Sequence, residues 1–264
     1  MKKNYSKENR KEFLSSFFLK KDLSDLEIEF EDGNLPAHSF ILMARSKIFK
    51  EIIQPNQKKI KFEQSENSIR HFLYFIYSFE YAIPNDTKSR FELLDLLKTF
   101  EFDDFKQELI EFIIDDLNHD NVGEVLEKSQ KYQISEIENE CFDQIISLGE
   151  KFLKSDELLK LRFHNIKSII ASDELQISEF ELLQTVYRYS NQFPNPIEIL
   201  EDLIHLIRFP LMNQMELCLI YEMDLLSHDE ILQLFLVCSS KGEFGKTKFS
   251  SKSRNFNKKI DVIE

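Results

Sequence analysis

The sequence predicts an α+β protein in which a β-hairpin leading into helices comes first and an all-helical region follows. Apolar and acidic side chains alternate strictly from Leu26 to Glu31, which is the period of a strand with one buried face. After residue 117 the strand signals stop, and apolar residues recur only at helical spacing. The 264 residues include only 5 Gly and 6 Pro, which argues against a loop-rich all-β fold.

A β-hairpin that leads into helices accounts for the first of these signals. The strand over residues 26–30 is followed by a turn at 32–34, because Gly tolerates a positive φ and Asp and Asn come close to tolerating it. Residues 35–37 predict a second short strand, and Pro36 places it at a sheet edge or a strand end. Apolar residues then follow helical spacing up to Ile53.

Later elements are predicted from apolar spacing and from helix-start signals. Ile60 and Phe62, set between Lys residues, predict a third short strand. Helices are predicted over residues 65–81, 89–100, 105–117, 197–209, 215–221 and 228–238. Capping-box patterns begin at Asn121, Ser135, Ser178 and Ser227. Short helices joined by short loops pack as antiparallel neighbours, so the second region is predicted to be a helical bundle or solenoid.

These signals divide the chain into two domains and two tails. Residues 12–117 form the sheet-containing domain, and residues 118–238 form the helical domain. Residues 1–11 and 239–264 are predicted to be a disordered N-terminus and a disordered basic tail. The charges of the basic tail lack an aromatic stacking ladder, which favours a solubilising or regulatory role over nucleic-acid binding.

The net charge and the number of cysteines limit which partners and which cellular compartment we expect for the protein. The net charge is −13, and residues 241–264 hold seven Lys/Arg against three Asp/Glu, which leaves −17 for the first 240 residues. Such an acidic body repels nucleic acid and acidic membrane surfaces, so we expect neither as a partner. An odd, sparse count of 3 Cys suits a reducing compartment. With no export signal visible, the expected location is cytoplasmic or nuclear, not secreted.

No residue pattern predicts catalysis, a metal or a cofactor. The 6 His never pair at i, i+3 or i+4, and no Cys lies close to one in sequence, whereas a metal site needs ligands at characteristic spacing. Gly33, Gly123 and Gly149 stand alone, which argues against a phosphate-binding loop. The adjacent carboxylates at 103–104 and 115–116 do not share a helix face. We therefore expect a binding protein that is not an enzyme and uses no cofactor.

An ordered set of residues resembles the core of the BTB (POZ) domain. The pattern runs through Asp25, Leu26, Ile28, Ala37-His38, Leu42, Ala44-Arg45-Ser46 and Phe49. Residues 72–78 resemble that family's helix ending in a Tyr-Ser step, and residues 91–113 resemble its last helix pair. The part after Asn121 resembles a BACK domain, through residues 172–175, Glu179, 207–211 and 226–232. The resemblance implies a BTB/POZ fold followed by an all-α BACK helical domain.

Many BTB–BACK proteins are substrate adaptors of cullin-3-type ubiquitin ligases, so the resemblance implies a homodimeric interaction adaptor that holds an unknown client protein. The implied cullin contacts are Phe49, Ile52, Ile53, Gln54, Tyr77 and Phe79. The family's hydrophobic-x-Glu motif belongs just after Ile53, where the sequence has Gln54-Pro55-Asn56-Gln57-Lys58 without the Glu. This departure favours the alternative, a cullin-independent BTB-mediated dimerisation scaffold without a ligase role.

A short apolar arm precedes the first strand. Phe13, Phe17 and Phe18 lie at helical spacing on a segment that has no core of its own, so it needs apolar surface to bury against. In domains that resemble this one the arm packs across a homodimer partner, and the implied dimer interface consists of Phe13, Phe17, Phe18, Asp25 and Leu26. The alternative is that the arm covers the sheet of its own domain.

Overall fold

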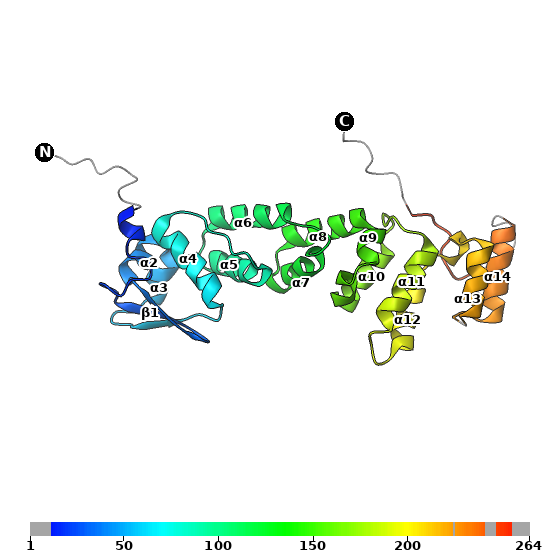
Figure 1. Cartoon of the computed structure of the whole chain (residues 1–264), viewed down its shortest axis with the longest axis horizontal. Coiled ribbons are helices and arrows are strands. Elements are labelled where there is room, and N and C mark those ends of the chain that lie inside the picture. The colour runs from blue at the N-terminus through cyan, green and yellow to red at the C-terminus, as the bar shows by residue number, and fades with distance from the viewer. Residues whose placement is uncertain (1–11, 224, 241–246, 255–264) are drawn as a thin grey trace, which may run out of the picture. The chain divides into compact units, whose positions relative to one another are not determined.

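The computed structural model describes residues 12–223, 225–240 and 247–254 and divides into two compact units (Figure 1). The first unit comprises Met1–Asp116 and Lys128–Ile137, and the second comprises Leu117–Glu127 and Glu138–Glu264. Residues 1–11, 241–246 and 255–264, which the sequence analysis assigns to disordered tails, lie outside the described residues.

A three-stranded sheet lies in the first unit, with strands β1 (Leu26–Phe30), β2 (Gly33–Ala37) and β3 (Lys59–Lys61). The strand order is β2-β1-β3, with β1 antiparallel to β2 and parallel to β3. The three apolar side chains of β1 are buried, as strict alternation predicts. The hairpin and the third short strand are therefore confirmed.

The helices of the first unit enclose an aromatic core. They are α2 (Ser39–Arg45), α3 (Lys47–Ile52), α4 (Glu66–Ser78), α5 (Thr87–Thr99) and α6 (Asp103–Asp115). Ser46 ends α2 and caps α3, because its hydroxyl accepts a hydrogen bond from the Ile48 N–H at 3.1 Å. The Phe49 and Phe100 rings stack with centroids 4.1 Å apart, and the Phe72 ring lies 5.2 Å from that of Phe100. The sheet and these helices together form the small α+β domain that the sequence predicts.

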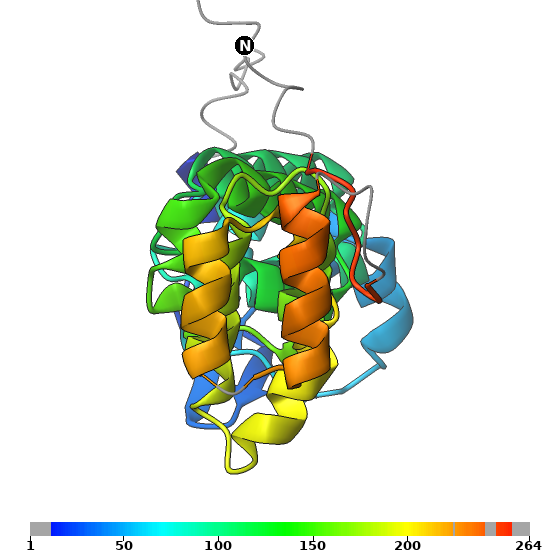
Figure 2. The same ribbon diagram turned by 90° about the vertical axis from the view of Figure 1, so that its right-hand side faces the viewer.

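Beyond this domain, all regular elements among the described residues are helical. They are α7 (Val122–Tyr132), α8 (Ser135–Leu148), α9 (Glu150–Leu153), η1 (Glu157–Lys160), α10 (Phe163–Ala171), α11 (Glu179–Ser190), α12 (Pro196–Ile204), η2 (Phe209–Leu211), α13 (Gln214–Glu222) and α14 (His228–Ser239). Figure 2 shows α13 and α14 packed side by side. No helix in the described part of the chain is long and apolar enough to cross a membrane.

Helix starts follow the local side-chain chemistry of the sequence. The predicted capping box at Ser227 is confirmed, since Ser227 and Glu230 form both of its hydrogen bonds. At Ser178 only one of the two bonds forms, from the Glu181 N–H to the Ser178 hydroxyl. A further capping box joins Asn213 to Glu216 and was not predicted.

The helix predicted over residues 197–209 is wrong at its end, since α12 stops at Ile204. A helix continuing through Pro210 would set the proline ring against the carbonyl of Leu206, and the chain leaves the helix earlier still, at His205. Pro210 lies instead in the 3₁₀ turn η2, which keeps Phe209 buried.

The prediction of a disordered tail does not hold for residues 247–254, which pack against the second unit. Phe249 is buried, and its ring lies 4.6 Å from that of Phe209. Arg254 is also buried and forms an ion pair with Glu179. From composition alone, the cations of this segment are expected to be solvated, because composition does not show acidic residues that are distant in sequence but close in space.

Gly149 occupies a backbone conformation that side chains resist, with φ 48° and ψ −121°. A Cβ there would lie 2.9 Å from the Gln176 carbonyl oxygen. We expect Gly149→Ala to lower the free energy of unfolding by about 2 kcal/mol or more, from backbone strain and this clash. Urea denaturation followed by circular dichroism measures the change. The matched control is Gly123→Ala in α7, where the added Cβ would meet its nearest neighbour at 3.4 Å and we expect no loss.

Candidate protein-interaction sites

Two aromatic side chains of the apolar arm, Phe17 and Phe18, pack against the first unit, and the third, Phe13, is exposed to solvent. The Phe17 ring packs edge-on against His38 at 5.5 Å, and the Phe18 ring packs against Tyr74 at 5.6 Å. Phe13 is 63% exposed. The arm thus contacts its own unit, and it leaves one large ring available to a partner.

A buried hydrogen-bond cluster lies beneath the arm. The His38 N–H donates to the Tyr77 hydroxyl at 2.9 Å, and the His38 Nδ1 lies 2.9 Å from the same oxygen. The His38 Nε2 lies 2.9 Å from the Asp22 carbonyl oxygen. Burial raises the pKa of Tyr77 to about 12, so its hydroxyl stays protonated. His38 is therefore a core residue at the strand–helix junction, joined to the helix that carries Tyr77.

Asp25 and Leu26, both predicted to lie in a dimer interface, differ in exposure. Asp25 is exposed and accepts hydrogen bonds from the Ser39 N–H at 2.8 Å and from the Ser39 hydroxyl at 2.5 Å. Burial raises the pKa of Asp25, but these hydrogen bonds outweigh it and hold the pKa below its usual value. Leu26 is buried in the sheet core, so its side chain offers no contact to a partner.

The six predicted cullin-contact residues fall into two groups. Phe49 and Tyr77 have side chains that are 0% and 1% exposed, and both belong to the core. Ile52 is 40% exposed, Phe79 is 38% exposed and Gln54 is exposed, while Ile53 is half-buried. Ile52, Ile53, Gln54 and Phe79 can contact another protein directly. Phe49 and Tyr77 cannot, because their side chains are buried in the core.

Arg45 lies beside Phe79 and was not singled out as a site residue by the sequence. The Arg45 guanidinium carbon lies 3.6 Å from the Phe79 ring centroid and 5.3 Å from that of Phe75. Burial lowers the pKa of Arg45, and its Nε is buried without a hydrogen-bond partner among the described residues. Phe79 adopts φ 63° as the residue that ends α4, which directs the chain around this stacked pair. A Phe directly after the Tyr77-Ser78 step is the only sequence signal for this arrangement.

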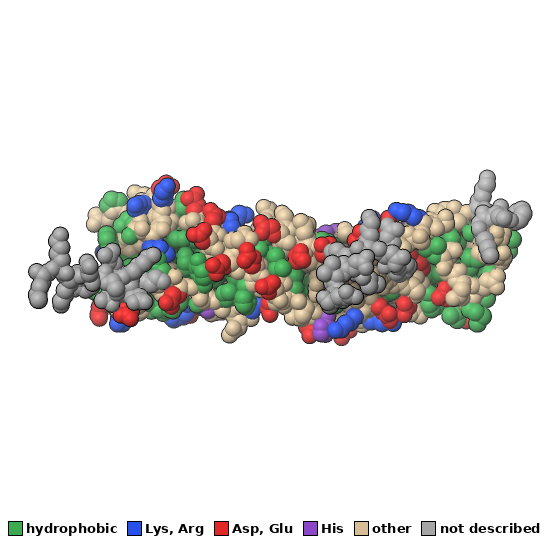
Figure 3. Space-filling model, turned by 90° about the horizontal axis from the view of Figure 1, so that it is seen from above, with side chains coloured by type: hydrophobic (Ala, Val, Ile, Leu, Met, Phe, Trp, Pro, Cys, Tyr) green, Lys and Arg blue, Asp and Glu red, His purple; other side chains and the backbone are tan. Residues whose placement is uncertain are grey.

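These side chains form one wall of an open cavity of about 450 Å³. The cavity is lined by Arg45, Phe75, Phe79, Tyr81, Glu101, Phe102, Asp103, Asp104 and Phe105. Aromatic side chains and three acidic residues thus line the same cavity. No group of three or more His, Cys, Asp or Glu side chains in the described ranges is placed to hold a metal ion. Figure 3 shows apolar atoms interspersed with Asp and Glu on the face that it displays.

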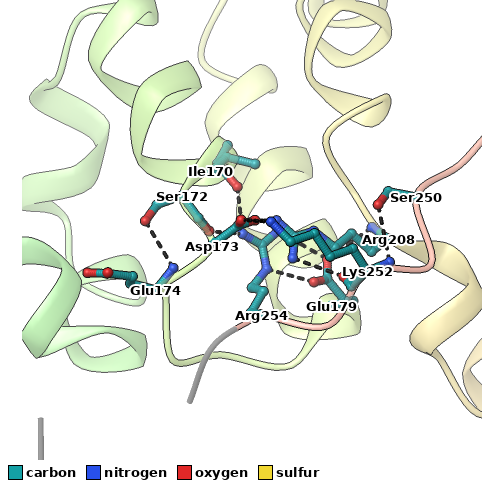
Figure 4. A network of polar contacts seen from close by, with 9 residues as sticks. All are labelled: Ile170, Ser172, Asp173, Glu174, Glu179, Arg208, Ser250, Lys252 and Arg254. Carbon is teal, nitrogen blue, oxygen red and sulfur yellow. Dashed lines mark hydrogen bonds and ion pairs between the residues drawn. The ribbon is translucent and has the colours of Figure 1, made fainter. Parts of the chain in front are cut away.

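In the second unit, residues that the sequence singled out around 172–175, Glu179 and 207–211 come together (Figure 4). The Arg208 N–H donates to Glu179 Oε2 at 3.0 Å, and the Arg208 Nη2 donates to Asp173 Oδ1 at 2.5 Å. These charge-assisted hydrogen bonds join Arg208, the residue before η2, to the start of α11 and to the turn that precedes α11. Tyr189 is buried, and its hydroxyl donates to the Leu161 carbonyl oxygen at 2.9 Å.

Comparisons with known proteins identify two families along the chain. Residues 14–117 match the BTB/POZ domain family, and residues 122–222 match the family described as BTB And C-terminal Kelch (BACK). BTB/POZ domain-containing protein 9 of Drosophila melanogaster is 22% identical over 196 residues, which are 72% of this chain and 27% of that protein. Kelch-like protein 13 of Mus musculus is 25% identical over 194 residues, which are 70% of this chain and 29% of that protein.

The chain thus spans less than a third of the length of these two relatives. Among solved structures, the BTB domain of human gigaxonin superposes with a TM-score of 0.34 at 24% sequence identity, covering 39% of this chain and 86% of that domain. The two family matches follow one another in the order that the sequence analysis expects. The chain belongs to the BTB–BACK family, with a BTB/POZ domain at residues 14–117 followed by a BACK domain at residues 122–222.

Proposed function

We propose that this protein is a homodimeric protein–protein interaction adaptor that presents a client protein to a cullin-3-type ubiquitin ligase. The observation that carries the proposal is the BTB/POZ domain at 14–117 followed directly by a BACK domain at 122–222. In this role the protein positions two partners and performs no chemistry. Its three free cysteines suit a cytoplasmic or nuclear location, and burial raises the pKa of the Cys141 thiol to about 12, which keeps that thiol unreactive.

The proposed cullin-binding surface consists of Ile52, Ile53, Gln54, Phe79 and Arg45. Exposed apolar side chains on α3 and at the end of α4 supply area to bury, and the cavity beside Arg45 supplies a receptor for a protruding side chain. Arg45 would gain a hydrogen-bond partner there, because its Nε is desolvated already. Calorimetry with the N-terminal helices of cullin-3 tests this surface.

The proposed dimer uses the apolar arm. We expect the intact chain to be a dimer by light scattering and Phe13→Asp to shift it to monomer, because the substitution would bury a charge in the interface. Phe13 is 63% exposed in a single copy, so its replacement should leave the free energy of unfolding of the monomer nearly unchanged. Ile197→Asp, at an exposed site in the second unit, is the control and should stay dimeric. A monomeric wild-type chain would exclude the dimer.

A cullin-independent dimerisation scaffold is the second candidate. The specific observation in its favour is the exit loop of α3, where residues 54–58 carry no Glu. Within that loop the Gln57 side chain accepts from the Gln54 N–H at 2.9 Å and donates to the Lys59 carbonyl at 2.8 Å, which folds the loop on itself. If the chain is dimeric but shows no heat of binding when titrated with cullin-3 helices, the result favours this candidate over the ligase adaptor.

A further inference from the structure

Residues 247–254 lie against the second unit without helix or strand of their own. The sequence of this segment is Thr-Lys-Phe-Ser-Ser-Lys-Ser-Arg. Its contacts with the rest of the unit come mainly from four side chains, those of Lys248, Phe249, Lys252 and Arg254. Because side chains make these contacts, another chain with the same side chains could reproduce them.

Arg254 is the most deeply buried of the four, with its side chain 1% exposed (Figure 4). Its Nε donates to Glu179 Oε1 at 2.6 Å, and its Nη2 donates to Glu179 Oε2 at 3.3 Å. Its Nη1 donates to the carbonyl oxygens of Ile170 at 2.8 Å and Ser172 at 2.5 Å. A planar guanidinium that meets a carboxylate and two carbonyls in this way is recognised by its shape as well as its charge.

Four further contacts set the direction of the segment. Lys252 forms an ion pair with Asp173, and its carbonyl accepts from Arg208 Nη1 at 3.0 Å. Lys248 forms an ion pair with Glu230 at 2.6 Å. Between these cations, the Phe249 ring packs on Phe209. Each cation of the segment thus meets its own acidic group, spaced along an extended chain.

The acidic partners all belong to the unit and not to the segment. Glu179 is buried, and Arg254 is its only ion-pair partner among the described residues. A buried carboxylate without a paired cation is strongly destabilising, so the position beside Glu179 favours a cationic side chain. A further cavity of about 290 Å³ opens beside Ser253 and Arg254, and Leu211, Met212 and Glu216 contribute to its lining. The segment therefore does not fill all the available space.

We propose that the groove formed by Asp173, Glu179, Arg208, Phe209 and Glu230 is a recognition site for extended segments of the pattern Lys-Phe-x-x-Lys-x-Arg. Residues 247–254 occupy it as an intramolecular ligand, and a partner protein that carries the same pattern displaces them. Only the identification of that partner as the adaptor's client rests on the proposed function; the recognition itself does not.

Peptide binding to the full-length chain tests the proposal. The probe is a fluorescent peptide with the sequence of residues 247–254, acetylated and amidated so that it carries no terminal charges. The acceptor is the variant Phe249→Ala/Lys252→Ala/Arg254→Ala, whose groove is no longer filled by its own segment. We expect the anisotropy of the probe to report binding at least about tenfold tighter than to wild type, since occupied grooves lower the apparent affinity by the fraction that is open.

Two controls make the result specific. Adding Glu179→Gln to the triple variant should weaken probe binding at least about tenfold, because a charge-assisted pair with the Arg is lost. A probe with Arg replaced by Ala should bind equally weakly. A folded triple variant that does not bind the probe would overturn the proposal, and so would equal affinity for wild type and variant.

If the triple variant does not fold, the wild-type groove can be opened instead. A protease recognition sequence replaces residues 241–246, and the folded protein is then cut there. We expect the cut protein to exchange its own segment for the probe, whereas the uncut protein does not. Absence of exchange would mean that residues 247–254 are a fixed part of the fold. Dimer and cullin measurements address the first unit, so their failure is distinguishable from failure of this test.

Discussion

Phe49→Ala is expected to lower the free energy of unfolding of the BTB domain by about 3–5 kcal/mol, the cost of removing a fully buried aromatic side chain. Phe49 is 0% exposed, and its ring stacks on Phe100 at 4.1 Å and packs near Phe72 at 6.2 Å. The substitution would leave a cavity at the centre of this cluster. Urea denaturation followed by circular dichroism measures the loss.

Ile52→Ala is the matched control, because Ile52 lies on the same helix with 40% of its surface exposed. We expect it to cost less than about 1 kcal/mol, as partly exposed truncations do. The pair separates a core role from a contact role for α3. If Phe49→Ala left stability unchanged while cullin binding was lost, Phe49 would be a contact residue and its assignment to the core would be wrong.

Arg254→Ala is expected to release residues 247–254 from the second unit. Removing one partner of a buried ion pair costs about 3–5 kcal/mol when the other stays buried, and detachment of the segment lets water reach Glu179 instead. Trypsin cleaves after Lys248 and Lys252, and its rate follows the population of the open form. We expect cleavage there to accelerate at least about tenfold, which mass spectrometry of the digest measures.

Lys252→Ala is the control for that experiment. The Lys252 side chain is mostly exposed, and exposed ion pairs contribute less than about 1 kcal/mol, so cleavage after Lys248 should stay near the wild-type rate. Equal protection of Lys248 in Arg254→Ala and wild type would mean that Arg254 does not anchor the segment.

The sheet and most helices could be predicted because their signals are local. Alternation over residues 26–30 predicts β1 by itself, and the turn predicted at 32–34 partly overlaps the actual turn at 31–32, after which β2 begins at Gly33. The end of α12 was misplaced because apolar spacing continues to Phe209, while the helix ends at Ile204. Boundaries of this kind depend on backbone geometry that periodicity does not contain.

The site was harder to predict, because the same apolar spacing serves a core and a contact surface. Phe49 and Ile52 lie three residues apart on one helix, yet one is buried and the other exposed. Arg45 gave no signal of its own, since its stacking partner Phe79 comes from a different helix end. Arg254 and Glu179 are 75 residues apart, so the sequence does not show that they pair. The tail is therefore predicted from the sequence alone to be disordered and solvated.

Titration of the N-terminal helices of cullin-3 into the full-length chain in a calorimeter tests the adaptor role most directly. The adaptor role predicts saturable binding of one cullin segment per protomer, and Ile52→Asp should abolish it without loss of fold or dimer, because Ile52 is 40% exposed and lies in the proposed contact. Absence of heat with a folded dimer would contradict the ligase role and leave the cullin-independent scaffold as the function.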